Sequence, residues 1–148
     1  IDKIYSKQPT VRSFNKFYSV RFTSQIIAQK LRRSVKFGLK KWEIPFNLLK
    51  TRQAKLAWLK AFFSAEAYVG EEVIKIQTVN PKGMLQVSDL LNSLKINTFL
   101  YNYTPKNPNW SIVKIIHIRS YEDRLKFYNE IGFWHSKKTE KLKETLGL

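Results

Sequence analysis

The chain has 148 residues, of which 43% are hydrophobic and 14% aromatic, and this composition favours one folded domain with a core over a disordered basic tail. It has no cysteine, which excludes a disulfide framework and a thiolate metal site and fits an intracellular protein. Its formal net charge of +16, from 27 Lys and Arg against 11 Asp and Glu, favours a polyanionic partner such as nucleic acid. Binding to an acidic membrane surface and simple solubility are the alternatives for this charge. No apolar run approaches the roughly 20 residues that span a bilayer, and no terminal amphipathic helix strongly supports a membrane-surface protein, so we expect no membrane partner.

The first part of the chain predicts a β-hairpin followed by a basic helix. Residues 10–23 alternate apolar and polar side chains and are interrupted near Asn15, which is typical of two short antiparallel strands. Ser24 is a cap residue at the start of an amphipathic pattern over 24–37, which predicts a helix.

The second part predicts a longer series of elements. Cap residues at Thr51, Asn80, Ser120 and Ser136 mark the starts of four helices. The predicted elements are a helix from 51 to about 69, a strand at 72–79, a helix at 81–96, strands at 97–104 and 111–119, and helices at 120–132 and from 136 to about 147.

This α-β-α-β-β-α-α order predicts one compact α+β unit. We therefore divide the chain into residues 1–50, a hairpin plus a basic helix, and residues 51–148, the compact unit.

A weak internal repeat links the two parts. The stretch FYSVRFTSQIIAQKLRR resembles SIVKIIHIRSYEDRLKFY, since each has a strand, a Ser cap and a basic amphipathic helix. Strand-cap-helix units are common, so chance similarity and a genuine repeat both stay open. In a genuine repeat, residues 1–50 would be the closing part of an earlier copy.

One segment carries a family resemblance. LKAFFSAEA at 59–67 resembles the motif of the LAGLIDADG homing endonucleases and their maturase relatives. Further similarity to the family, in its order and spacing, extends over roughly residues 40–148 and is carried by KKWEIP, VIKIQTVN, LLNSLKI and RLKFYNEIGFWHSKKTEKL.

The resemblance implies a concave antiparallel sheet backed by helices, which binds double-stranded DNA or structured RNA. When two halves pair, it implies Mg²⁺-dependent, site-specific cleavage of double-stranded DNA. The alternative is a cleavage-deficient relative, acting as an RNA-binding maturase or as a structural protein of a large RNA assembly such as an organellar ribosome. The expected location is a mitochondrion, a chloroplast or an archaeal cytoplasm.

The resemblance also implies a pairing helix, because two motif helices pack against each other in the family. The second half would come by homodimerisation or from another chain. The candidate pairing residues are Leu59, Ala61, Phe62 and Ala65, of which the alanines permit a close approach of two helices.

The motif places one carboxylate at the helix end. By resemblance, Glu66 is the catalytic metal ligand of one half, because a hard oxygen ligand suits Mg²⁺. The alternative is an ordinary solvated carboxylate. Lys137 is a candidate for electrostatic assistance at the phosphate, and the alternatives for it are simple phosphate contact or solubility. Three positions depart from the family: Ser64 replaces an acid, and Ala61 and Ala67 replace glycines. At Ala67 a turn with positive φ would be strained.

Basic and polar residues are expected to contact nucleic acid, chiefly from the strands. Alternation places Lys75 and Gln77 on the sheet face opposite Ile74 and Ile76. Such side chains hold phosphates or hydrogen-bond base edges, although an ordinary solvated sheet face is the alternative. The candidates are Arg21, Arg32, Arg33, Lys75, Gln77, His117, Arg119 and Lys138.

Three aromatic residues alternate along the strand predicted at 97–104. Phe99, Tyr101 and Tyr103 share one face, and we expect the two tyrosines to belong to core or sheet packing rather than to a base-stacking platform.

Overall fold

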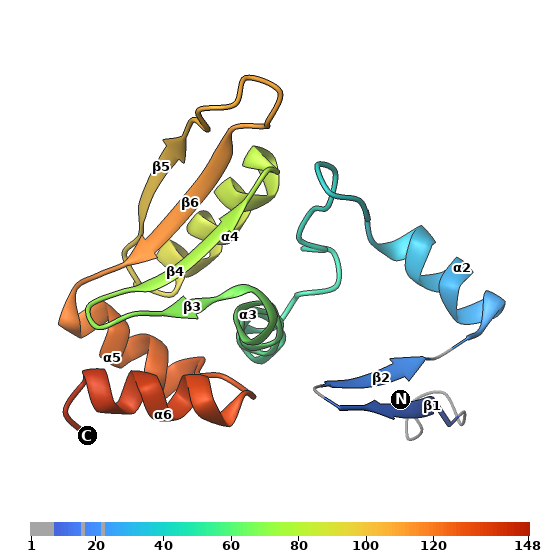
Figure 1. Cartoon of the computed structure of the whole chain (residues 1–148), viewed down its shortest axis with the longest axis horizontal. Helices are drawn as coiled ribbons and strands as arrows, with labels where there is room; N and C mark the ends of the chain where they lie inside the picture. Colours follow the sequence, from blue (N-terminus) through green and yellow to red (C-terminus); the bar gives the residue numbers. More distant parts are fainter. Residues whose placement is uncertain (1–7, 16, 22) are drawn as a thin grey trace. The chain divides into compact units, whose positions relative to one another are not determined.

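The structure is a computed structural model that describes residues 8–15, 17–21 and 23–148 (Figure 1). The chain separates into two compact units, Ile1–Ser34 and Val35–Leu148.

The division therefore falls before the expected boundary at residue 50, because the intervening segment packs into the second unit. Ile44 is buried in its core, and the Asn80 side-chain nitrogen donates a hydrogen bond of 2.6 Å to the carbonyl oxygen of Trp42. The ring of Trp42 also lies against Gly83, where a built Cβ atom would come within 2.5 Å of it. Only glycine fits at that contact, and the segment that contains Trp42 and Ile44 therefore packs closely against the second unit.

The first unit is a hairpin and a helix, as predicted. Its elements are β1 (Thr10–Phe14), β2 (Phe17–Arg21) and α2 (Gln25–Ser34), and the two strands pair antiparallel. The Ser24 hydroxyl accepts a hydrogen bond of 3.4 Å from the Ile27 amide, which confirms the cap. The helix ends at Ser34, before the predicted end at residue 37. The Ser34 hydroxyl donates a hydrogen bond to the Lys30 carbonyl oxygen. Residues 16 and 22 of the predicted hairpin lie outside the described ranges.

The second unit is an α+β domain, which confirms the predicted fold class. Its elements are α3 (Arg52–Glu66), β3 (Tyr68–Val69), β4 (Ile74–Thr78), α4 (Pro81–Ser93), β5 (Phe99–Tyr103), β6 (Val113–Ile118), α5 (Tyr121–Glu130) and α6 (Ser136–Thr145).

The short strand β3 corrects the predicted series. We expected the motif helix to run to about Val69, but it ends at Glu66 because Ala67 has extended backbone angles, with φ −78° and ψ 143°. Tyr68 and Val69 then pair antiparallel with β4. The order from α3 is therefore α-β-β-α-β-β-α-α.

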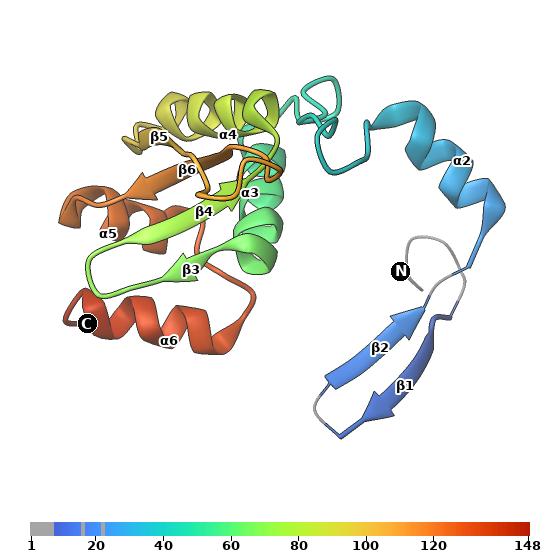
Figure 2. The same ribbon diagram turned by 45° about the horizontal axis from the view of Figure 1, so that its top comes forward.

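The four strands form one antiparallel sheet in the order β3-β4-β6-β5 (Figures 1 and 2). One face is buried, and α4 lies behind β4 and β6 on that side (Figure 1). The buried strand residues on this face are Val69, Ile74, Ile76, Ile116 and Ile118. They meet core side chains from each helix of this unit, chiefly Leu59, Phe63, Met84, Val87, Leu91, Phe127 and Leu142.

Helix caps fix most boundaries of the second unit. The predicted caps Thr51, Asn80 and Ser120 each accept a hydrogen bond of 3.0–3.1 Å from an amide in the first turn. The fourth prediction is wrong: Ser136 is the first residue of α6, and His135 occupies the cap position without a side-chain cap bond. Serine is tolerated in a first helical turn, so its presence did not fix the boundary to one residue.

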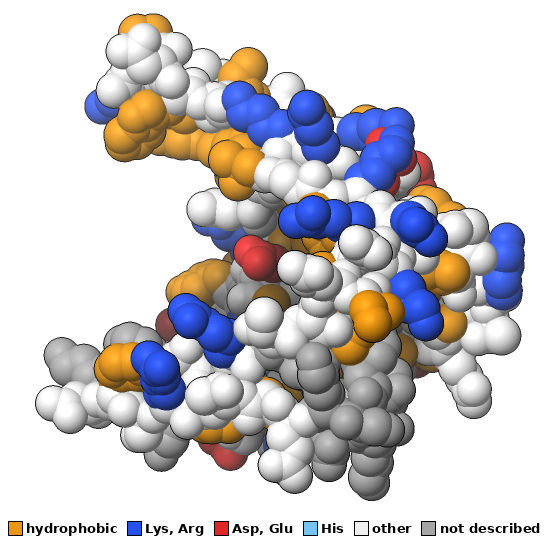
Figure 3. All heavy atoms as spheres, turned by 90° about the vertical axis from the view of Figure 1, so that its right-hand side faces the viewer, with side chains coloured by type: hydrophobic (Ala, Val, Ile, Leu, Met, Phe, Trp, Pro, Cys, Tyr) orange, Lys and Arg blue, Asp and Glu red, His pale blue; other side chains and the backbone are white. Residues whose placement is uncertain are grey.

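Positive charge is spread over the molecule. Figure 3 shows one face, on which Lys and Arg side chains are widely distributed and Asp and Glu are sparse. Among the described residues, no helix is both long and apolar enough to cross a membrane.

Candidate nucleic-acid interface

The face of the sheet opposite the core is open. Lys75 and Gln77 of β4 lie on it, and the strand register places His117 and Ile115 of β6 beside them. Ile74 and Ile76 are fully buried on the other side, which confirms the predicted alternation of β4. Lys75 is half-buried and Gln77 is exposed, so the polar ends of both side chains reach solvent.

The aromatic residues of β5 also lie on this open face, and the exposure of Tyr103 corrects the expectation of core or sheet packing for that residue. Phe99 lies opposite His117, and Tyr103 opposite Val113. Phe99 is 60% exposed and Tyr103 is 53% exposed. Of the two tyrosines, Tyr101 shows the expected sheet packing, because its ring contacts those of Phe99 and His117. The alternating sequence pattern placed Phe99, Tyr101 and Tyr103 on one face of the sheet, but it does not indicate which face the helices cover.

His117 is held at the centre of the open face. Its Nε2 atom lies 3.0 Å from the Tyr101 hydroxyl, and the two rings meet edge to face. Partial burial lowers the pKa of His117, and the positive charges of Arg119 and Lys75 lower it further. The neutral imidazole therefore dominates at neutral pH and serves as a hydrogen-bonding partner rather than as a cation.

Arg119 follows β6 and is exposed beside this face. Its backbone is fixed by Arg124, whose Nε donates a hydrogen bond of 3.2 Å to the Arg119 carbonyl. Arg124 is buried, and its Nη1 donates to the Glu71 carbonyl at 3.1 Å, so it joins the end of β6 to the β3–β4 turn. No sequence pattern had singled out Arg124, since the Glu71 carbonyl that it binds lies 53 residues earlier in the chain.

The motif helix ends in an unstrained turn. Ala67 has negative φ, so the expected strain of a missing glycine is absent. Glu66 is the last helical residue and is exposed. Ser64, at the position of a family acid, accepts a hydrogen bond of 2.8 Å from the Trp134 amide. The end of α3 is thus tied to the loop before α6.

Lys138 has a structural partner at the same place. Its Nζ donates hydrogen bonds to the carbonyl oxygens of Ser64 at 2.7 Å and Ala65 at 3.5 Å, so it caps the C-terminus of α3. Partial burial lowers the pKa of its ammonium group, and the charge of Glu66 opposes this shift. Lys137 is exposed on the first turn of α6.

These residues offer at most half of a metal site. Within the described ranges, no group of three His, Cys, Asp or Glu side chains could hold a metal ion. Glu66 alone supplies a carboxylate at the end of α3. One exposed carboxylate is a weak ligand set for Mg²⁺, so this position fits a divalent ion only when other ligands come from a second half or from substrate phosphates.

The predicted pairing residues divide into two groups. Leu59 is fully buried, and the Phe62 ring stacks on Trp58 with centroids 5.0 Å apart, so these two side chains belong to the chain's own packing. Ala65 is exposed and Ala61 half-buried, which leaves their small side chains on the outer side of α3.

The basic candidates of the first unit lie on its two parts. Arg21 shares a hairpin face with Arg12, which sequence reasoning had missed, and both line a pocket of about 340 Å³ on that face. Arg32 and Arg33 are exposed near the end of α2.

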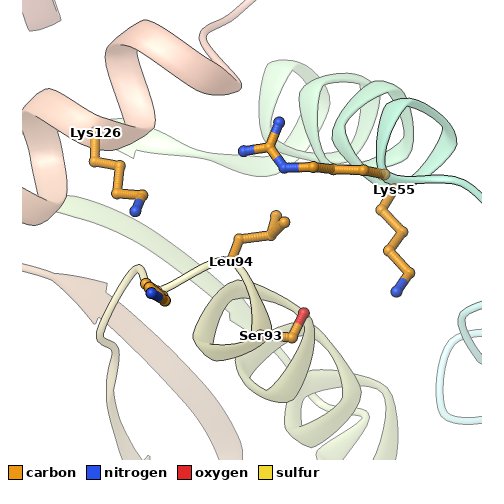
Figure 4. A pocket seen from close by; sticks show the side chains of 6 residues that line it. Lys55, Ser93, Leu94 and Lys126 are labelled. Atoms are coloured by element: carbon orange, nitrogen blue, oxygen red, sulfur yellow. The ribbon is translucent and has the colours of Figure 1, made fainter.

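A basic pocket in the helical layer was also missed. It has a volume of about 380 Å³ and is lined by Arg52, Lys55, Ser93, Leu94, Lys95 and Lys126. Figure 4 shows Lys55 of α3 and Lys126 of α5 on either side of Leu94. Four cations meet there from distant parts of the chain, and Glu130 pairs with two of them, Arg52 at 2.7 Å and Lys126 at 3.8 Å. The remaining positive charge suits a phosphate or another anion.

The comparison with known families agrees with this architecture. The family model described as LAGLIDADG-like domain matches residues 53–132, from the first turn of α3 to the glycine after α5. The chain belongs to the LAGLIDADG family. Membership carries a homing-endonuclease or maturase type of nucleic-acid binding and the pairing of two domains, and LAGLIDADG endonucleases generally depend on a divalent metal. No curated protein matches the chain.

Proposed function

We propose that this LAGLIDADG domain binds double-stranded DNA or structured RNA through the open face of its β3-β4-β6-β5 sheet. The supporting observation is the charge of that face. All four strands lie in the described part of the chain and contain no Asp or Glu, whereas Lys75 and the adjoining Arg119 supply positively charged side chains. Strands without acids, in a chain of net charge +16, attract phosphates.

The polar side chains of this face have separate tasks. Lys75 and Arg119 neutralise phosphates, which provides affinity without sequence information. Gln77 has both a donor and an acceptor, so it can hydrogen-bond base edges. Neutral His117 can donate or accept one hydrogen bond at the same surface.

Salt dependence tests the proposal. Lys75→Gln and Arg119→Gln each remove one cation from the open face, and each should reduce the slope of log K against log salt by about 0.9 on duplex DNA. Lys143→Gln removes the same charge from the exposed surface of α6 and serves as the matched control. Equal losses in all three variants would show non-specific attraction to the whole chain and would contradict a sheet interface.

Metal-dependent cleavage by a paired form is the second candidate, and Glu66 at the exposed end of α3 favours it. A bound Mg²⁺ would activate water and stabilise the leaving oxygen of the scissile phosphate. Glu66 would hold one side of that ion, and the second carboxylate would come from another copy or another chain, paired along the Ala61–Ala65 side of α3. Lys137 is the nearby candidate for contact with the reacting phosphate.

The chain by itself is proposed to bind without cutting, as an RNA-binding maturase or a protein of a large RNA assembly would. Ser64 cannot supply a carboxylate and is hydrogen-bonded to the loop before α6. Plasmid nicking across Mg²⁺ concentrations separates the two candidates. If the paired form cleaves, Glu66→Gln abolishes nicking and preserves DNA binding, whereas undiminished nicking by this variant removes Glu66 from the mechanism.

A further inference from the structure

The edge strand β5 presents a row of aromatic rings. Phe99 and Tyr103 are more than half exposed, while Leu100 between them points to the core and is partly buried. A single exposed ring needs no explanation. Several exposed rings side by side are costly in water and mark a binding site. Three rings, of which two are exposed, share one face of this strand and form an aromatic strip. Such a strip marks a binding surface.

The middle ring of the strip is held in place. The Tyr101 ring centroid lies 5.8 Å from that of Phe99 and 5.1 Å from that of His117. Its hydroxyl lies 3.0 Å from His117 Nε2. The rings of Phe99 and Tyr101 are tilted by 46° rather than stacked on each other, so they leave ring surface available to a ligand.

The spacing of the rings selects among nucleic acids. Side chains on the same face of a strand are about 7 Å apart along the strand. Stacked bases of a duplex are about 3.4 Å apart, and their flat faces are covered by their neighbours. The strip therefore cannot stack on the bases of an intact duplex, whereas a single strand with splayed bases can place one base on each ring.

Basic side chains lie beside the strip. Across the sheet, Phe99 lies opposite His117, and His117 lies opposite Lys75, so these three form one row of the open face. Arg119 follows at the exposed end of β6. A strand of nucleic acid whose bases rest on β5 would have its phosphates within reach of Lys75 and Arg119, and single strands require this combination of a stacking platform and positive charge.

We propose that β5 and its neighbours bind unpaired bases of a single-stranded segment, with Phe99, Tyr101 and Tyr103 as stacking platforms and Lys75 and Arg119 as phosphate contacts. The inference rests on the proposed sheet interface and assigns its substrate class. The shared chemistry is an exposed base face, which RNA loops and single-stranded DNA both provide.

The test compares three fluorescently labelled probes of about 16 nucleotides: a single-stranded RNA of mixed sequence, the DNA of the same sequence, and the fully paired DNA duplex. Phe99→Leu and Tyr103→Leu keep apolar area at the site and remove the ring. Tyr121→Leu, at an exposed aromatic residue of α5, is the matched control. A probe with 2-aminopurine reports stacking directly, because its fluorescence falls when the base stacks. Thermal unfolding of each variant checks that the fold is retained.

We expect each β5 variant to lose about 5- to 150-fold in affinity for the single-stranded RNA, to reduce the quenching of 2-aminopurine, and to bind the duplex within about twofold of the parent chain. Equal affinity for the two single strands, or tighter binding of RNA, supports the inference, since rings stack on either and the 2′-hydroxyl adds contacts. Unchanged single-strand binding by both Leu variants would overturn it and leave the sheet interface standing. Failure of the parent chain to bind any probe would overturn the sheet interface itself.

Discussion

Two regions of this chain share the same local design and differ in what they bury. Both β1–β2–α2 and β5–β6–α5 are antiparallel hairpins followed by a helix with a serine cap, at Ser24 and Ser120. α5 buries Asp123, Arg124 and Phe127, whereas no residue of α2 is buried. Local sequence signals are therefore sufficient to start a hairpin and a helix, but a core needs partners from elsewhere in the chain.

The partners of α5 are identifiable. Its Phe127 ring lies 4.9 Å from that of Phe63 on α3 and 5.2 Å from that of Phe133 before α6. The corresponding position of α2, seven residues after its cap, is Leu31, which is 42% exposed. The two helices thus differ in stability through long-range contacts rather than through their own propensity.

The largest expected difference between the two regions is in core truncation. Phe127→Ala should cost about 3–5 kcal/mol of unfolding free energy, because it removes a fully buried ring and leaves a cavity. Leu31→Ala should change that free energy by no more than about 0.5 kcal/mol. Urea unfolding measures both, and a cost of Leu31→Ala above 2 kcal/mol would show that α2 is packed as firmly as α5.

Loss of the caps should give a smaller difference. The Ser120 hydroxyl accepts from the Asp123 amide at 3.0 Å and donates to the Asp123 carboxylate at 2.6 Å, so Ser120→Ala should cost about 1–2 kcal/mol. Ser24→Ala removes a longer bond of 3.4 Å and should shorten α2 without changing the global unfolding free energy. Hydrogen exchange of the amides in α2 and α5 measures the two effects separately. The comparison would fail if Ser24→Ala lowered the global value as much as Ser120→Ala.

The smallest difference concerns pH. Arg21 lies three residues before the cap Ser24, and His117 lies three residues before the cap Ser120, so the two residues occupy corresponding strand positions. Because the pKa of His117 is lowered in the folded state, the unfolded chain binds more protons as pH falls below about 6.5. The contribution of neutral His117 to the free energy of unfolding is present above that pH and is lost as pH falls through the pKa of His117 in the folded state. His117→Gln should flatten the dependence between about pH 7 and pH 5, and an unchanged dependence would assign it to other groups.

Signals close together in the sequence predicted their structure well. The cap residue Asn80 predicted the start of α4, and the cap residue Ser120 predicted the start of α5, since a cap lies within three residues of the amide that it binds. β3 was missed because its two residues become a strand only by pairing with β4. Boundaries set by long-range pairing leave little trace in a short window.

The site was predicted less completely for the same reason. Alternation placed Lys75 and Gln77 correctly, but the side of the sheet that α4 covers decides whether Phe99 and Tyr103 are core or surface. Lys138 caps carbonyl oxygens of α3 that lie more than 70 residues earlier in the chain, and such a contact has no local pattern.

The most direct test of the sheet interface is an NMR titration of the 17.5 kDa chain with nucleic acid, using the single-stranded RNA and the DNA duplex described above. The account predicts that the largest amide and side-chain shifts fall on the open face, at Lys75, Gln77, His117 and Arg119, with the β5 rings shifting most with the single strand. The exposed side of α4, at Leu85 and Asp89, should shift least. Shifts concentrated on α4 or in the basic pocket, with the sheet face unchanged, would contradict it.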